Sequence, residues 1–223
     1  MTTPFYVAPE QMMKDRADYA RKGIARGRSL IAMSYVNGIF ICAENPSSTL
    51  HKVSEIYDRI AFAGVGKYNE FDQLRIAGVR HADLKGFTYS REDVGAASLA
   101  NNYAQMLGQT FTHEMKPMEV EILVAEITDT PGEEQLFQIL YDGTVQDHNK
   151  FVVLGGDSEA ITDRVRVNFK GGLSANGALE LCRSALAGDD RELSDGDLEV
   201  AMLDRTLGRR TFRRISDDEV SKL

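Results

Sequence analysis

The chain has 223 residues, which is enough for one domain with a sizeable hydrophobic core. Its 26 Lys and Arg residues are outweighed by 34 Asp and Glu residues, and the formal net charge of -8 argues against a nucleic-acid-binding surface. No apolar run approaches the ~20 residues that span a bilayer, and the N-terminus lacks the basic-then-apolar pattern of a secretory signal, so we expect a cytoplasmic protein that binds neither membrane nor nucleic acid.

The N-terminal segment divides into a tail and a helix. Residues 1–8 contain a proline and show no helical pattern, so they are expected to form a loose tail. Within the tail, Phe5-Tyr6-Val7 is an apolar triplet that open solvent does not favour. Pro9 suits a first helical position, and a helix is predicted over residues 9–26. Its apolar residues recur at helical spacing, at Met13, Ala17, Ala20 and Ile24.

Two β-hairpins follow this helix. The apolar period changes to two, which predicts strands over residues 29–36, 38–44, 52–57 and 60–66. Asn37-Gly38, the strongest two-residue hairpin signal, joins the first two strands. Asp58-Arg59 joins the other two.

Two long helices are predicted next. The first covers residues 67–86, and its apolar face consists of Phe71, Leu74, Val79 and Ala82. The second is expected to begin at Ser90, with Asp93 three residues later as a weaker form of the capping box. Its inward stripe is expected at Leu99, Tyr103, Met106 and Thr110.

The second half of the chain repeats the order of strands and then helices. Strands are predicted over residues 118–127, 135–141 and 151–156, helices over 158–167 and 174–187, and closing strands over 197–204 and 210–216. Strands that cluster in hairpins form antiparallel sheets, and paired helices cover the outer faces of such sheets. The predicted fold class is therefore α+β: a single four-layer αββα sandwich with two antiparallel sheets between helix pairs.

The residues that often carry chemistry favour ordinary roles here. Cys42 and Cys182 lie in apolar surroundings far apart in the sequence, which favours buried free thiols over a disulfide. The histidines have no neighbouring ligand at metal-site spacing, so no metal and no cofactor are expected. Ser221-Lys222-Leu223 matches a peroxisomal address, but residues 216–223 also have a helical pattern, and chance or truncation is favoured over targeting.

Three long stretches agree in order and spacing with one family. They are RKGIARGRSLIAMSYVNGIFICAENPSSTLHKVSEIYDRIAFAGVGKYNEFDQLR, YAQMLGQTFTHEMKPMEVEILVAE and YDGTVQDHNKFVVLGG. They resemble α-type proteasome subunits, most closely those of actinobacteria, and the resemblance covers about residues 5–215. It implies the N-terminal nucleophile hydrolase fold, which agrees with the sandwich predicted from the hairpins and helices.

The threonines at the N-terminus invite comparison with the catalytic members of this fold. Loss of the initiator methionine would give Thr2 a free α-amine beside its hydroxyl, which is a nucleophile–base pair. The resemblance implies, however, that the nucleophile begins the first strand, where this chain has Arg28 and Ser29. It also matches Glu44 and Lys52 to the catalytic acid and lysine. Arginine cannot attack a carbonyl and Ser29 has no free α-amine, so the chain is expected to hold no catalytic residue.

The resemblance implies instead a non-catalytic subunit of a heptameric α ring that templates rings of catalytic β subunits. The helix over 9–26 would lie on the ring face that is free of β subunits, ahead of a sandwich over 27–223. Seven tails would meet at the axial pore and gate it, whereas a disordered terminus is the alternative. The gate residues are Thr2, Thr3, Pro4, Phe5, Tyr6, Val7 and Ala8.

Two further sites follow from the resemblance. Lys52 matches the lysine that binds the C-terminal carboxylate of an activator, with pocket neighbours in residues 23–28, and a solvated strand lysine is the alternative. His113, Glu114 and Met115 match a narrow annulus below the gate. The family's glycines are missing there, and an ordinary loop after a helix is the alternative.

The implied partners are the β subunits, a hexameric AAA ATPase and polypeptides that carry the prokaryotic ubiquitin-like tag, which the ATPase reads. Two rival functions make different predictions. A threonine-type peptidase acting through Thr2 or Ser29 would be modified covalently by a threonine-directed inhibitor. A scaffold without proteolysis would form homo-rings and bind no β partner.

Overall fold

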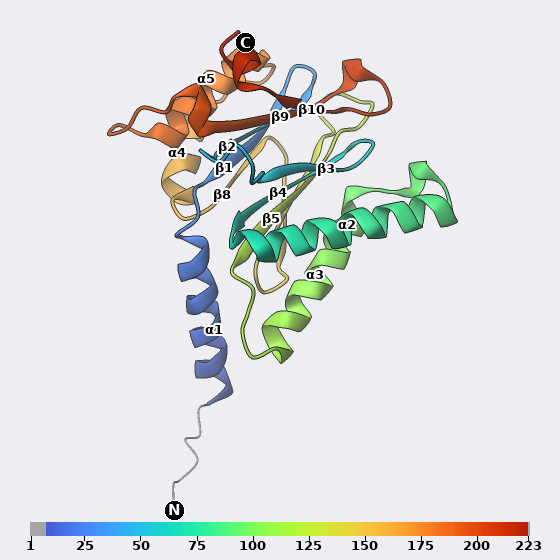
Figure 1. Ribbon diagram of the computed structural model, residues 1–223, viewed down its shortest axis with the longest axis vertical. Coiled ribbons are helices and arrows are strands. Elements are labelled where there is room, and N and C mark those ends of the chain that lie inside the picture. The colour runs from blue at the N-terminus through green and yellow to red at the C-terminus, as the bar shows by residue number, and fades with distance from the viewer. Residues whose placement is uncertain (1–7, 223) are drawn as a thin grey trace, which may run out of the picture.

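Residues 8–222 are described by the computed structural model, in which helices flank two stacked β-sheets (Figure 1). The helices are α1 (Pro9–Ile24), α2 (Tyr68–Thr88), α3 (Ala96–His113), α4 (Ser158–Asn168), α5 (Ala175–Ala187) and α6 (Asp217–Val220). The strands are β1 (Leu30–Tyr35), β2 (Gly38–Glu44), β3 (Val53–Tyr57), β4 (Ile60–Gly66), β5 (Val120–Glu126), β6 (Gln135–Ile139), β7 (Val145–His148), β8 (Phe151–Leu154), β9 (Leu198–Asp204) and β10 (Phe212–Ile215).

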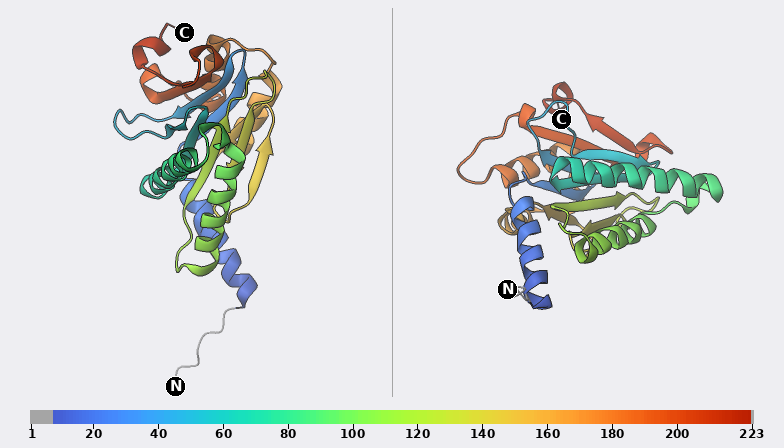
Figure 2. Two further views of the ribbon diagram at one scale, coloured as in Figure 1. Left: turned by 90° about the vertical axis from the view of Figure 1, so that its right-hand side faces the viewer. Right: turned by 60° about the horizontal axis from the view of Figure 1, so that its bottom comes forward.

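Both sheets are antiparallel, and each has five strands within the described residues. The strand orders are β10-β9-β2-β1-β8 and β3-β4-β5-β6-β7. Helices α4 and α5 contact the first sheet, and α2 and α3 contact the second. Figure 2 shows the resulting layers from two further sides. The predicted αββα sandwich is confirmed.

Strand β1 shows how the sequence builds this stack. Leu30 and Ala32 lie in the core between the two sheets, whereas Ile31 and Met33 lie in the core under α4 and α5. Side chains alternate between the faces of a strand, and here both faces are covered. The strand is therefore apolar apart from Ser34, which explains the nearly unbroken run of buried residues.

The predicted hairpins are confirmed. Tyr35 pairs with Gly38 across the first turn, and Tyr57 pairs with Ile60 across the second. Gly38 has φ 149°, and a Cβ added there would lie 2.2 Å from the Leu203 carbonyl oxygen. Only glycine can adopt this φ and also leave room for the backbone of β9, so the close approach of β9 requires a glycine in this turn.

Helix α1 is anchored to the sandwich by its C-terminal half and by Arg16, which donates to the end of α3. Its last turn contributes the buried Ala20 and Ile24 to the core between the sheets, while its first turns extend beyond the sandwich (Figure 1). The helix ends at Ile24, two residues earlier than predicted, and Ala25 caps it. Of the predicted gate, only Ala8 is described, and Thr2 to Val7 lie outside the described residues.

Three expectations were wrong in detail. Helix α3 begins at Ala96 and not at Ser90, because Ser90 caps a separate 3-10 turn by accepting from the Glu92 N–H at 3.3 Å. The N–H of Ala96 bonds instead to the Glu126 carboxylate, at 2.7 Å. The predicted strand over 135–141 ends at Ile139, and β7 was missed because its residues are mostly polar and lie on an edge.

Other expectations hold within the described residues. Cys42 and Cys182 are buried free thiols in the core under α4 and α5. The helical pattern after residue 216 corresponds to α6. Of the helices within residues 8–222, none has the length and apolar character that crossing a bilayer requires.

Candidate functional site

The start of β1 brings together the residues that the sequence predicted as a vacated catalytic cluster. The Arg28 guanidinium donates to Glu44 Oε1 at 2.5 Å. The Lys52 ammonium donates to the Arg28 carbonyl oxygen at 2.6 Å. Strands β1 and β2 pair from Leu30 opposite Ala43, which places Arg28 and Glu44 at the same end of the sheet.

Glu44 is the buried centre of this cluster. Its side chain is only 5% exposed, while those of Arg28 and Arg191 are each 51% exposed. Arg191 donates to both carboxylate oxygens, at 2.9 and 3.2 Å, and also to the Leu186 carbonyl oxygen at 2.8 Å. A buried carboxylate needs such pairing, and two guanidinium groups supply it.

Ser29 lies next to this cluster as an internal residue of the chain. The residue is buried, and a Cβ added at the facing Gly155 would lie 2.6 Å from the Ser29 hydroxyl oxygen. Its carbonyl oxygen accepts from the Glu44 N–H at 3.0 Å, as expected for a residue inside the chain whose own nitrogen is a peptide. The hydroxyl therefore lacks the free α-amine that an N-terminal nucleophile requires.

A hollow of about 430 Å³ opens beside Glu44. Its walls mix both signs of charge: Arg26, Arg28, Arg164 and Arg191 face Glu44, Asp157, Asp189 and Asp190. Most of the lining residues are charged, Ser29 is the only one with a hydroxyl, and none has a thiol. Lys52 does not line this hollow.

Lys52 lies partly buried at the end of the loop that joins β2 to β3. Burial lowers its pKa to about 8, while Glu199 and Glu44 counteract the fall and Arg28 adds to it. The ammonium has three donors, and the Arg28 carbonyl takes one of them. The remaining donors and the charge suit a carboxylate from outside the chain.

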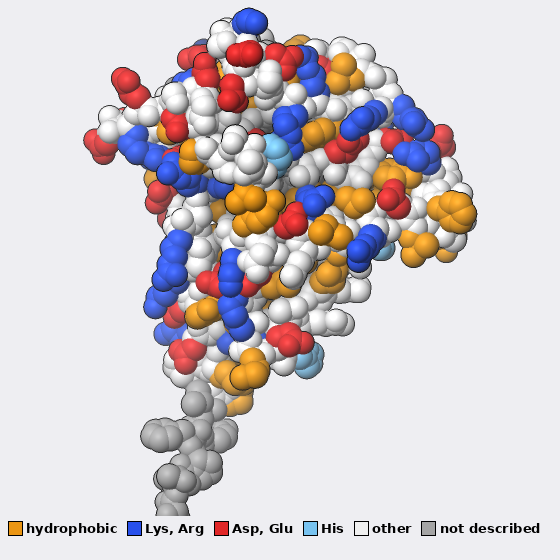
Figure 3. All heavy atoms as spheres, in the orientation of Figure 1, with side chains coloured by type: hydrophobic (Ala, Val, Ile, Leu, Met, Phe, Trp, Pro, Cys, Tyr) orange, Lys and Arg blue, Asp and Glu red, His pale blue; other side chains and the backbone are white. Residues whose placement is uncertain are grey.

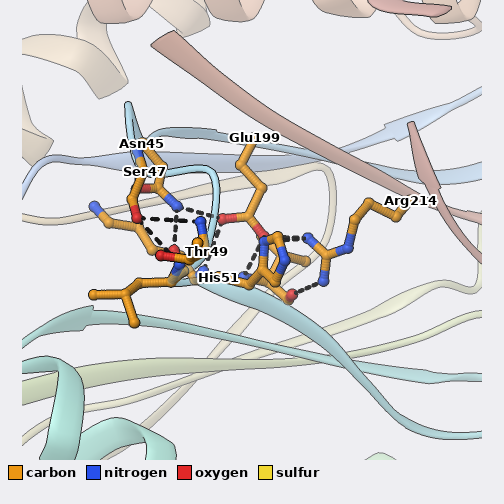
Figure 4. Close-up of polar contacts among 9 residues, drawn as sticks. Asn45, Ser47, Thr49, His51, Glu199 and Arg214 are labelled. Carbon is orange, nitrogen blue, oxygen red and sulfur yellow. Dashed lines mark hydrogen bonds and ion pairs between the residues drawn. The ribbon is translucent and has the colours of Figure 1, made fainter. Parts of the chain in front are cut away.

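The loop over residues 45–52 is held by side chains from two other strands, as Figure 4 shows. Glu199 of β9 accepts from the Lys52 N–H at 2.7 Å and from the Asn45 side-chain amide at 2.8 Å. Arg214 of β10 pairs with Glu199 and donates to the Val53 carbonyl oxygen at 2.6 Å. Glu199 and Arg214 thus position the segment that carries Lys52.

Residues 24–203 match the proteasome subunit family. The chain belongs to this family. It is 63% identical over 220 residues to the proteasome subunit alpha of Acidimicrobium ferrooxidans, covering 99% of this chain and 95% of that one. It is 54% identical over 226 residues to that of Xylanimonas cellulosilytica, covering 96% and 93%. The match to that of Thermobifida fusca is 51% over 226 residues, covering 100% and 91%.

These relatives confirm the resemblance to α-type subunits of actinobacteria. Together with the two antiparallel sheets and their flanking helices, the family match also confirms the N-terminal nucleophile hydrolase type of fold.

The predicted annulus residues lie at the other end of α1. Helix α3 ends at His113, and Arg16 of α1 caps it by donating to the carbonyl oxygens of Phe111 at 2.7 Å and of Glu114. Met115 is fully exposed, and with Met12 it lines an apolar hollow of about 550 Å³. Hydrophobic side chains gather at this lower end of the molecule (Figure 3).

Sequence reasoning missed Asn45, Glu199 and Arg214. The signal for Glu199 was present, since a carboxylate interrupts the otherwise apolar run of β9 and is buried there. Buried carboxylates need partners, so the sequence implied that Glu199 has a polar partner but did not indicate which residue it is. Its partner Lys52 lies 147 residues earlier in the chain. A local sequence pattern carries no information about contacts over such a separation.

Proposed function

We propose that the chain is a non-catalytic subunit of a heptameric α ring in a cytoplasmic proteasome core, where it templates catalytic β subunits of a threonine-type endopeptidase. The observation that supports this proposal most directly is the set of contacts at the start of β1. There Arg28, Glu44 and Lys52 are in contact, yet the cluster contains no hydroxyl with a free α-amine. A chain that matches α subunits over nearly its whole length thus has the partners of a nucleophile without the nucleophile.

Access to the core is the proposed task of the N-terminal end. Helix α1 is held by its last turns and by Arg16, and its first turns project from the sandwich. Residues 1–8 would then reach the ring axis and close the pore with the apolar triplet of seven copies. His113, Glu114 and Met115 lie at the same end of the molecule, which supports a place below this gate.

Activator docking is the proposed task of Lys52. The side chain offers a charge and free donors in a partly buried setting, where a charge-assisted contact is stronger than on an open surface. The proposed partner is a hexameric AAA ATPase whose C-terminal carboxylate binds there. That ATPase would read the prokaryotic ubiquitin-like tag of the substrates, so this chain needs no site for the tag.

The gate is tested by peptide hydrolysis in the assembled α–β core. Intact α chains are compared with chains lacking residues 1–8 and with a full-length variant in which Phe5 and Tyr6 are replaced by Ser. We expect both changes to raise turnover, because both remove the apolar closure, while the second keeps the length of the tail. Unchanged turnover in assembled particles would contradict the gate.

The same experiment tests the vacant site. If removal of residues 1–8 abolished hydrolysis while assembly stayed intact, catalysis would reside in this chain. Labelling by a threonine-directed inhibitor gives a separate readout. We expect the label on the β subunits alone, and label on this chain would overturn the non-catalytic assignment.

A further inference from the structure

The loop over residues 45–52 crosses from β2 of one sheet to β3 of the other without regular structure. Most of its side chains face solvent, and its one large apolar residue, Leu50, is 49% exposed. The loop therefore lacks an apolar anchor that could fix its path. Its position depends on polar contacts, and Lys52 is its last residue.

Glu199 contacts the loop at both ends, beside backbone bonds from the Asn45 N–H to Asp197 at 2.8 Å and from the Gly64 N–H to Lys52 at 3.0 Å. Its carboxylate accepts from the backbone N–H groups of Lys52 at 2.7 Å and Val53 at 3.1 Å. It also accepts from the Asn45 side-chain amide at 2.8 Å, and Asn45 in turn donates to the Leu50 carbonyl oxygen at 2.7 Å. One carboxylate thus binds both ends of the loop (Figure 4).

The carboxylate is in turn compensated by a cation. Glu199 is 8% exposed, which would be costly for an unpaired charge. Arg214 binds Glu199 with one arm of its guanidinium and the Val53 carbonyl oxygen with the other. The His51 imidazole lies 3.4 Å from the same carboxylate, with its side chain 44% exposed. The network is therefore satisfied from several sides, and a satisfied network of this kind fixes a unique geometry.

We propose that Glu199 is the positioning residue of the activator-docking lysine: it binds both ends of the loop and so fixes where the Lys52 ammonium is presented. This inference rests on the proposed docking role of Lys52. Glu199 itself touches no ligand, because its oxygens are already occupied by the loop and by Arg214.

The charge of Glu199 adds a second contribution. Burial lowers the pKa of Lys52, and Glu199 is the first of the groups that counteract this fall, ahead of Glu44. Arg28 acts in the opposite direction. Glu199 therefore favours the protonated amine that a carboxylate ligand needs, in addition to placing it.

The first test is amide hydrogen exchange of the full-length chain carrying Glu199→Gln, read by mass spectrometry. An amide cannot accept from all these donors at once, so we expect exchange at Lys52 and Val53 to speed up more than about tenfold. Asn45→Ala, which removes one of the donors to Glu199 and keeps the carboxylate charge, should give a smaller increase in exchange at Lys52 and Val53. Glu134→Gln is the matched control, because Glu134 is also buried and also binds an arginine and a backbone N–H.

The second test is stimulation of peptide hydrolysis by the ATPase activator, normalised to each particle's rate without activator. We expect Glu199→Gln to raise the half-maximal activator concentration by about tenfold or more while the maximal stimulated rate is retained. The double variant Lys52→Ala/Glu199→Gln should have the same half-maximal activator concentration as Lys52→Ala. Glu199 acts only through the contact between Lys52 and the activator, which Lys52→Ala already removes. Glu134→Gln should leave the half-maximal concentration unchanged.

The outcomes separate the two proposals. If Lys52→Ala weakens stimulation and Glu199→Gln does not, the positioning role is wrong and the docking role stands. If Lys52→Ala has no effect, the docking role is wrong, and the positioning of the docking lysine is overturned with it, whatever hydrogen exchange shows. Unchanged exchange at residues 52 and 53 in Glu199→Gln would overturn the positioning role by itself.

Discussion

Glu44 and Glu199 lie on the paired strands β2 and β9, both are buried, and both bind arginine, yet their surroundings differ. Every side-chain contact of Glu44 comes from an arginine that is half exposed, and the carboxylate borders a hollow. Glu199 is bound by backbone N–H groups and by a buried amide as well. The two sites show that the type of donor matters more than burial for the structural role of a carboxylate. Half-exposed arginines neutralise the charge of Glu44 and can hydrate without it. Backbone N–H groups cannot move away, so the Glu199 carboxylate is needed to hold the loop in place.

The largest effect should follow removal of the framework carboxylate. Glu199→Ala leaves two backbone N–H groups without their acceptor and Arg214 without its carboxylate partner, so we expect the free energy of unfolding to fall by about 3–5 kcal/mol. Urea unfolding of the isolated chain, with an unchanged slope, measures this loss. A loss below about 1 kcal/mol would show that the loop contacts are replaceable by water.

Activator docking should depend on pH through Lys52. The pKa of about 8 lies below the ordinary value for lysine, so the charge is present below this pH and lost above it. We expect the half-maximal activator concentration to rise about tenfold from about pH 7 to about pH 9. Lys52→Arg should flatten this dependence because arginine keeps its charge, and an equally steep curve in that variant would assign the titration to another group.

Weaker docking in this range would not reflect unfolding. Unfolded Lys52 keeps its proton up to its ordinary pKa of 10.5, whereas the folded chain releases it near 8. Between these two values the unfolded state binds more protons, so this group makes the folded state more stable as the pH rises. Docking and stability thus change in opposite directions, and thermal unfolding at both pH values separates them.

A smaller loss is expected at the other carboxylate. Glu44→Ala frees Arg28 and Arg191, whose half-exposed guanidinium groups can hydrate in place, so we expect a loss of about 1 kcal/mol. The same urea experiment measures it. A loss equal to that of Glu199→Ala would remove the distinction between the two sites.

The sequence predicted most of the fold because its signals were local. Asn37-Gly38 predicted a hairpin in which β9 approaches the turn closely, and the apolar, strand-like run over residues 29–36 predicted β1. The start of α3 was wrong because Ser90 does cap a turn, but Val94 and Gly95 take extended conformations before the helix begins. Strand β7 was missed because a polar edge strand has no apolar period to read.

The candidate site was predictable only where the resemblance supplied the positions. Arg28, Glu44 and Lys52 were named together, and the structure places them in contact. Glu199 and Arg214 were not named, since their partners lie 147 and 161 residues away in the chain. Polar contacts over such separations depend on how two sheets stack, which no local pattern reports.

The smallest effect is expected at an exposed pair, and it sets the baseline for the comparison. Arg166 binds Asp163 at 2.7 Å, with side chains 66% and 67% exposed. Because both groups are already hydrated, Arg166→Ala should change the free energy of unfolding by no more than about 0.5 kcal/mol. The expected losses then rank by the surroundings of the carboxylate: hydrated at Asp163, paired with half-exposed arginines at Glu44, and bound by backbone N–H groups at Glu199. A loss at Arg166 as large as that at Glu44 would mean that arginine pairing alone sets the cost, and the contrast between Glu44 and Glu199 would need another explanation.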